Sequence, residues 1–217
     1  MKKSCLFFKI TAVFIALSSI FLSNCQAQDE WEARHNAYQP PEKVMDLMGV
    51  KKGMTIAEVG AGTGRYAVHM AKRVGEAGKV YANDINKESL DYLKKRCKRD
   101  KIKNIETILG KVTDPMLPKN KIDIVYCINT YHHIEKQVEL LKNIIPALKS
   151  DGRLIIIEHD PEKVKKLGWD SHSLNHHTTA KEKVIKQGKA AGYKLLKAES
   201  PDFLERDNVY FFVPIKK

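Results

Sequence analysis

A glycine-rich turn is the part of the sequence best suited to hold a ligand. Glycines stand at positions 60, 62 and 64, and an acid, Glu58, precedes the first of them by two residues. The apolar run at 54–57 predicts a buried strand before the turn, and residues 66–71 predict a helix after it. Glycines at a strand-to-helix turn let the backbone approach a ligand closely, with helix N–H groups directed at it.

Histidines are the second group of residues that could do chemistry. Six of the eight fall after predicted strands or in the loop that follows them: His132, His133, His159, His172, His176 and His177. The carboxyl ends of parallel strands meet at the ligand crevice of a doubly wound sheet, so we expect these imidazoles to crowd one rim. The loop from about residue 160 to residue 178 is long enough to be a lid or a substrate site.

Three interpretations of this rim compete. The default is that the histidines line a polar pocket. His132 or His133 could instead act as a general base, because an imidazole titrates near neutral pH and suits proton transfer. The third is a divalent metal site built from His132, His133 or His159 with His176 or His177, although no close ligand spacing favours it. We assign His132 and His133 as the candidate catalytic residues and assign no metal ligands.

The elements that must position these groups alternate between strand and helix patterns. Further strands are predicted at 79–84, 124–129, 148–158, 193–196 and 209–213. This alternation predicts one α/β domain, with a doubly wound, mostly parallel sheet and helices on both faces. A chain of 217 residues can bury a full core but has little room for a second domain.

Two of the predicted helices carry an apolar stripe at helical spacing. The stripes are Leu90, Leu93 and Cys97 after the second strand, and Leu141, Ile144, Ile145 and Leu148 after the fourth. Thr179 and Glu182 have the spacing of a capping box that would open the last helix, and Gly192 would end it.

The acid followed by alternating glycines resembles motif I of the class I S-adenosylmethionine (SAM) methyltransferases, a seven-stranded, Rossmann-like family. The resemblance continues over about residues 38–215 and implies the strand order 3-2-1-4-5-7-6, with the seventh strand antiparallel. It implies that Asp84, at the end of the second strand, binds the ribose hydroxyls, that Ile85 faces the adenine and that Asn129 lies near the methionine end. The full cofactor-binding set that it implies is Glu58, Gly60, Gly62, Gly64, Asp84, Ile85 and Asn129.

Three other positions bear on this resemblance. The segment from Tyr131 to His133 is similar to a pattern found after the fourth strand in several methyltransferase groups. Arg65 stands where the nicotinamide-binding fingerprint needs a small residue, which disfavours a dehydrogenase. Lys111 stands where many relatives have an acid that meets the adenine amine, and a lysine cannot accept that hydrogen bond. Asp114 or a backbone carbonyl would have to accept it instead.

The first 27 residues resemble an export signal rather than part of this fold. Lys2 and Lys3 precede a mostly apolar run at 10–22, which is short for a membrane span and fits a secretory signal. The signal could end as a loose lipobox with a lipidated Cys25, at a signal-peptidase site after residue 27, or as an uncleaved anchor. We expect residues 1–27 to be a signal peptide or lipoprotein leader that directs the chain to the cell envelope.

The rest of the chain is expected to form two parts. Residues 28–50 form an N-terminal segment in which residues 31–38 could close over the site, and residues 51–217 form the SAM-binding domain. The net charge is +12, but the basic residues are scattered and lack interleaved aromatics, so no nucleic-acid partner is predicted. An anionic membrane surface fits the charge and the leader better. Cys97 and Cys127 are expected to be free thiols.

These features together predict a SAM-dependent methyltransferase that acts on an unidentified small-molecule acceptor at or near an envelope membrane. Because methyl transfer is an in-line attack, the main task of the protein would be to position the acceptor against the methyl group. The alternative is an envelope protein that binds SAM or S-adenosylhomocysteine (SAH) without turnover, or binds metal, on a methyltransferase fold. An exported domain would need a supply of SAM outside the cytosol. The sequence makes no prediction of oligomeric state.

Overall fold

A computed structural model describes residues 28–215, so the predictions for residues 1–27 lie outside the described residues. The chain divides into two units, of which the first ends at Pro40 and the second begins at Pro41. Residues 28–38 of the first unit form a helix. Within residues 28–215, no helix is both long enough and apolar enough to cross a membrane.

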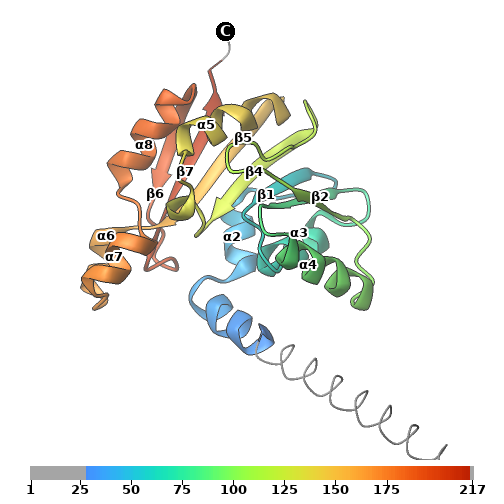
Figure 1. Cartoon of the computed structure of the whole chain (residues 1–217), viewed down its shortest axis with the longest axis horizontal. Helices are drawn as coiled ribbons and strands as arrows, with labels where there is room; N and C mark the ends of the chain where they lie inside the picture. The colour runs from blue at the N-terminus through green and yellow to red at the C-terminus, as the bar shows by residue number, and fades with distance from the viewer. Residues whose placement is uncertain (1–27, 216–217) are drawn as a thin grey trace, which may run out of the picture. The chain divides into compact units, whose positions relative to one another are not determined.

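One seven-stranded sheet organises the second unit (Figure 1). The strands are β1 Thr55–Val59, β2 Lys79–Asp84, β3 Ile105–Leu109, β4 Ile122–Ile128, β5 Leu148–His159, β6 Tyr193–Glu199 and β7 Asp207–Pro214. They lie in the order β3-β2-β1-β4-β5-β7-β6, in which β7 runs antiparallel to β5 and β6 and the other neighbours are parallel. The predicted fold class and strand order are confirmed.

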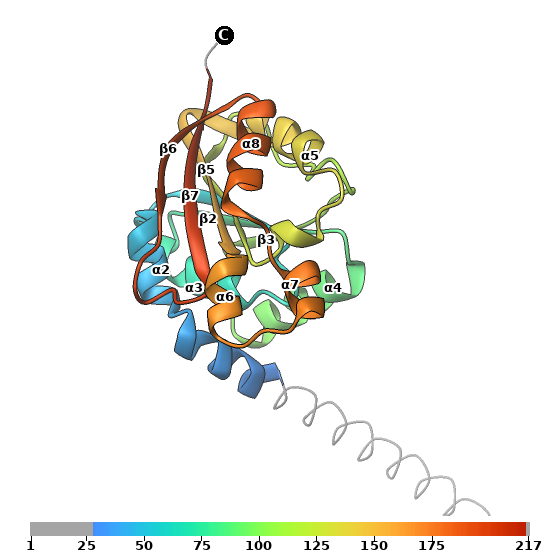
Figure 2. The ribbon, with the colours of Figure 1, turned by 90° about the vertical axis from the view of Figure 1, so that its left-hand side faces the viewer.

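Helices cover both faces of the sheet, as Figures 1 and 2 show together. They are α2 Pro41–Met48, α3 Arg65–Val74, α4 Lys87–Arg99, α5 Gln137–Ile144, α6 Pro161–Lys166, α7 Ser171–His177 and α8 Lys181–Ala190, with short 3-10 helices η1 Tyr131–His133 and η2 Ile145–Ala147. On β1, Ile56 packs in the core formed with α2, α3 and α4, whereas Ala57 packs in the core formed with α5 and α8. Because the central strands bury apolar side chains on both faces, a layer of helices packs against each face of the sheet.

Helix α2 belongs to the second unit, ahead of the predicted domain start at residue 51. Its apolar side buries Val44 and Met45, and Arg73 of α3 forms ion pairs with Glu42 and Asp46, each at 2.5 Å between nitrogen and oxygen. The predicted segment 28–50 is thus divided at Pro40. The closure of residues 31–38 over the site stays a prediction.

The segment around the last helix differs from the prediction in two ways. The predicted loop at 160–178 contains α6 and α7, which begin after the capping side chains of Asp160 and Asp170. The predicted capping box is wrong: α8 begins after Ala180 without a side-chain cap. Thr179 is buried, and its backbone N–H donates to the His159 carbonyl at 3.2 Å. This hydrogen bond to the end of β5 holds Thr179 in the segment that precedes α8.

The helix that carries the predicted apolar stripe after β4 ends before Pro146. Helix α5 ends at Ile144, Ile145 lies in η2, and Leu148 already begins β5. Leu141, Ile144 and Leu148 are nevertheless buried in the same core. The stripe on α4 buries Leu90 and Leu93.

Candidate functional site

A cavity of about 390 Å³ lies at the carboxyl ends of β1, β2 and β4. The strand order reverses between β1 and β4, and this is the point where doubly wound sheets bind ligands. We call the cavity the switch-point pocket. It is lined by Val59, Gly60, Asn83, Asp84, Ile85, Lys111, Val112, Thr130, His133, Ile134, Glu135 and Leu140.

The glycine turn reaches the lining of the switch-point pocket at Gly60, and its three glycines have positive φ angles of +80°, +52° and +88°. A Cβ added at Gly60 would overlap the side chain of Thr130, and one added at Gly64 would overlap Leu93. A Cβ at Gly62 would meet no atom within 4 Å. Gly60 and Gly64 are therefore required for packing, whereas Gly62 leaves open space beside its backbone.

Asp84 stands at the end of β2, and its two carboxylate oxygens accept backbone hydrogen bonds. Oδ2 accepts from Gly62 N–H at 2.7 Å, and Oδ1 accepts from Asn86 N–H at 2.8 Å. These bonds hold the carboxylate on the lining of the pocket, and they leave acceptor capacity because each oxygen has a second lone pair. Ile85 follows on the lining with 61% of its surface exposed.

The loop after β3 is anchored by Asn83, a residue that sequence reasoning missed. The buried Asn83 amide donates to the carbonyls of Ile108 at 3.2 Å and Pro115 at 3.0 Å. Lys111 and Val112 thereby reach the lining. The Oδ1 atom of Asp114 accepts from Met116 N–H at 2.8 Å and caps the loop, so the structure does not bring Asp114 to the pocket as a substitute acceptor.

Four of the seven predicted cofactor-binding residues do not line the pocket: Glu58, Gly62, Gly64 and Asn129. Glu58 is buried, accepts a hydrogen bond from the Tyr126 hydroxyl at 3.1 Å, and has its pKa raised by burial to about 8. Asn129 precedes Thr130 and has a left-handed backbone with φ of +50°. The Oδ1 atom of Asn129 is buried and has no hydrogen-bond partner among the described residues.

His132 and His133 come from η1 and lie beside the switch-point pocket, whose lining includes His133. His132 Nδ1 lies 2.7 Å from Oε1 of the fully buried Glu158, whose Oε2 also accepts from the His132 backbone N–H at 3.1 Å. The Nε2 atoms of the two histidines are 3.0 Å apart. Glu158, an acid at the end of an apolar strand, was not predicted as part of the site.

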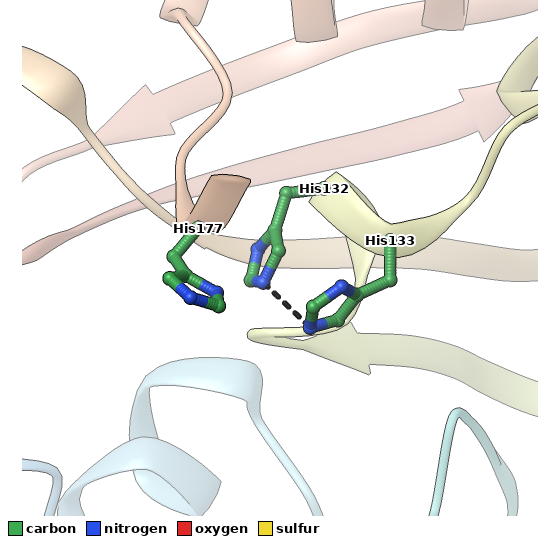
Figure 3. A group of neighbouring side chains, drawn as sticks. All are labelled: His132, His133 and His177. Carbon is green, nitrogen blue, oxygen red and sulfur yellow. Dashed lines mark hydrogen bonds between the residues drawn. The ribbon is translucent and has the colours of Figure 1, made fainter. Parts of the chain in front are cut away.

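His177 of α7 completes a group with these two residues, as Figure 3 shows. One nitrogen from each of His132, His133 and His177 lies within 4.8 Å of the others, and we call the three residues the histidine cluster. Burial and the neighbouring imidazoles lower the pKa of His133 and that of His177.

The other three histidines of the predicted rim lie outside this cluster, although the ring of His159 stacks on that of His132 with centroids 6.4 Å apart. The Nδ1 atom of His159 lies 2.6 Å from Oδ1 of the buried Asp207. His172 and His176 lie against each other on α7, with ring centroids 4.4 Å apart. The structure thus brings half of the predicted rim together in one cluster.

Comparisons with known proteins address the identity of this site. Residues 50–201 match a family model described as a methyltransferase domain. The demethylmenaquinone methyltransferase of Lactococcus lactis subsp. lactis is 26% identical over 155 residues, covering 69% of this chain and 58% of that protein. The ubiquinone/menaquinone biosynthesis C-methyltransferase UbiE of Escherichia fergusonii is 25% identical over 134 residues, covering 60% and 53%. The chain thus spans little more than half of these relatives.

A solved structure agrees with the family match. The SAM dependent methyltransferase from Aquifex aeolicus superimposes with a TM-score of 0.73 at 26% identity, over 81% of this chain and 90% of that one. The family model covers well over half of the present sequence. The chain therefore belongs to the class I SAM-dependent methyltransferases.

Proposed function

We propose that this enzyme transfers the methyl group of SAM to a small aromatic acceptor that carries an ionisable hydroxyl at or next to the reacting atom. The observation that carries the proposal is that one cavity joins the Asp84 carboxylate, which suits a ribose, to His133 of the histidine cluster. The two named relatives are a ubiquinone/menaquinone biosynthesis C-methyltransferase and a demethylmenaquinone methyltransferase, which supports an acceptor of quinol type. A binding protein without turnover would have no use for proton-handling groups at the pocket.

The residues present fit SAM. Asp84 offers two carboxyl oxygens toward the two ribose hydroxyls, and the open space at Gly62 lets a ligand approach the backbone. The unpaired Oδ1 of Asn129 is a buried acceptor that an ammonium group would satisfy, as the methionine end of SAM requires. We assign the cofactor to these residues together with Gly60, Gly64 and Ile85.

Two further assignments concern Glu58, which does not line the pocket, and the residues that would contact the adenine ring. The Glu58 carboxyl meets Tyr126 behind the turn, so we assign it a role in holding the turn. At the adenine end, Val112 and Ile85 offer apolar faces on the lining. Because Asp114 does not line the pocket, we propose that a backbone carbonyl of the loop after β3 meets the adenine amine.

When bound, SAM supplies a methyl group on a positively charged sulfur. The protein then has to align the acceptor with that methyl group and exclude water. A hydroxyl-bearing acceptor also has to lose a proton to become a strong nucleophile. We assign that task to the histidine cluster, in which His133 reaches the pocket and Glu158 orients His132.

Incubation of the purified protein with methyl-labelled SAM and a panel of phenols and quinols tests the proposal. We expect label in a product whose mass is increased by one methyl group, and formation of SAH. Calorimetry with SAH separates the two possible failures. SAH binding without label transfer to any member of the panel would favour the non-catalytic alternative, and absence of SAH binding would contradict the cofactor assignment.

A further inference from the structure

We infer that His132, His133 and His177 bind a divalent transition-metal ion, for which Zn²⁺ is the best match. Metal binding follows from the geometry of the three side chains alone. The purpose that we give to the metal, which is to hold the acceptor oxygen, rests on the proposed function. Imidazole nitrogen is a preferred ligand of zinc, and three protein ligands with one open position are typical of catalytic zinc sites.

The spacing of the nitrogens suits one ion. Zn–N bonds of about 2.0–2.1 Å in tetrahedral geometry place ligand nitrogens about 3.3 Å apart. The Nε2 atoms of His132 and His133 are already 3.0 Å apart, and one nitrogen of His177 lies within 4.8 Å of a ring nitrogen of each. His177 is exposed at the last residue of α7, so a side-chain rotation can bring it closer (Figure 3).

Glu158 holds His132 in the orientation that a metal ligand needs. Its carboxylate lies 2.7 Å from Nδ1 of His132 and also accepts the backbone N–H groups of His132 at 3.1 Å and His159 at 2.9 Å. These contacts surround the fully buried acid with groups that can donate hydrogen bonds to it. The Nδ1–H of His132 then donates to Glu158, so its Nε2 lone pair points at His133. A carboxylate behind a ligating histidine is the usual outer partner of zinc sites.

The contact between the two Nε2 atoms has a direct consequence. Without an ion, one of these nitrogens has to carry a hydrogen to form a bond at 3.0 Å. With His132 fixed by Glu158, that hydrogen belongs to His133. An ion that replaces it would be bound by both lone pairs, and His133 would move its hydrogen to Nδ1. Metal binding is therefore a local exchange that leaves the backbone in place.

The position of the cluster explains what the ion would do. His133 lines the switch-point pocket, so the open coordination position faces the place where an acceptor meets the cofactor. There the acceptor O–H bond would break, the oxygen would bind the ion, and the proton would go to water. Binding to a divalent ion lowers the pKa of a hydroxyl, so the acceptor would be ionised at neutral pH.

Zinc titration of the full chain, purified without a histidine tag and stripped with chelator, tests the inference. We expect one Zn²⁺ per chain, and a tetrahedral absorption spectrum when Co²⁺ is used instead. His177→Ala should weaken Zn²⁺ binding by more than the roughly 10–100-fold loss typical of an outer partner, and Glu158→Gln should cause that outer-partner loss. His172→Ala is the matched control on the same helix, and it should bind Zn²⁺ like the wild type.

The outcomes separate the metal site from the enzyme's function. Equal Zn²⁺ affinity in His177→Ala and His172→Ala, or no stoichiometric metal, would overturn the inference even if SAH still binds. Full turnover by metal-free protein in the presence of chelator would likewise overturn it and favour a general base. Zinc binding by a chain that does not bind SAH would leave the metal site standing and remove its proposed purpose. Because His177 is exposed and outside the pocket lining, its variant should fold and keep wild-type SAH affinity.

Discussion

At the scale of single residues, the glycine turn lies over an acid that burial keeps protonated near neutral pH. Loss of solvation raises the pKa of Glu58 to about 8, and the hydrogen bond from Tyr126 only partly opposes this. Arg65 favours the charged form and Asp84 disfavours it. Glu58 is therefore mostly neutral in the free protein at pH 7, and it supports the turn as a hydrogen-bonding group rather than as a charge.

Glu58 should make the stability of the protein depend on pH. Its pKa is raised from 4.5 in the unfolded chain to about 8 in the folded one, so folding favours the protonated form. This contribution to the free energy of unfolding is fully present below pH 4.5 and is lost as the pH rises to 8. Relative to the wild type, Glu58→Gln should gain about 1.4 kcal/mol per pH unit across that window.

Urea unfolding of wild type and Glu58→Gln at pH 5, 6, 7 and 8 measures this difference. Subtracting the two proteins at each pH cancels the titration of all other groups. A difference that stays constant between pH 5 and pH 8 would show that Glu58 is ionised in the folded state.

Asp84 should contribute the largest single share of cofactor affinity. Asp84→Ala removes charge-assisted hydrogen bonds to the ribose and should weaken SAH binding about tenfold or more, a cost on the order of 1.5–3 kcal/mol. Asp84→Asn keeps an acceptor for Gly62 N–H and should lose less. Calorimetry with SAH is the measurement. Asp91→Ala, at a partly exposed acid on α4 that pairs with Lys87 and Lys94, is the control and should bind normally.

At the scale of elements, the three glycines of the turn should respond differently to substitution. Gly60→Ala should destabilise the fold, because its methyl group would overlap Thr130 in addition to the strain of a positive φ. Gly62→Ala meets no protein atom and should cost only the strain, about 1–2 kcal/mol. Gly62→Ala should nevertheless weaken SAH binding, and Gly62→Val should abolish it, because the added atoms enter the space of the ligand.

Gly53→Ala is the matched control for this prediction. Gly53 also has a positive φ, +81°, and open space around its Cβ, but it precedes β1 and so lies at the opposite end of that strand from the glycine turn. Thermal unfolding and SAH calorimetry should therefore give Gly53→Ala the stability loss of Gly62→Ala without its loss of affinity. Similar SAH binding by Gly53→Ala and Gly62→Ala would contradict the placement of the ligand against the turn.

The strand order was predictable because motif order along the chain determines it within this family. The site was predictable where a residue ends a strand or closely follows one, as Asp84 ends β2 and His133 follows β4 in η1. Glu158 was missed because a carboxylate after an apolar strand is ordinarily solvated, and only the fold shows that His132 covers it. His177 could not be separated from His176 while residues 160–178 were taken as a loop, since the helix α7 decides which imidazole faces η1.

At the scale of the whole molecule, the cofactor and the expected destination of the chain belong to different compartments. SAM is the cofactor of the class to which the chain belongs, and SAM is made in the cytosol. The leader predicted at residues 1–27, which lie outside the described residues, would carry the enzyme to the envelope. A quinol-type acceptor would be met at a membrane surface, where a lipid anchor and the positive net charge both favour binding; that charge is +9 once cleavage removes Lys2, Lys3 and Lys9 from the +12 of the whole chain. We propose that the enzyme works at that surface.

Lipidation of Cys25 is the prediction that tests this proposal. A cysteine at the end of an apolar leader becomes the first residue of a lipoprotein when the leader is cleaved before it, so the wild type should incorporate a fatty-acid label in its native host. Cys25→Ser should lose the label and move from the membrane fraction to the soluble fraction, with SAH affinity unchanged in both proteins. Label in both proteins would exclude Cys25 as the only lipid site. Label in neither would favour simple secretion or an uncleaved anchor, and an active wild-type pool confined to the cytosol would contradict export and remove the problem of SAM supply.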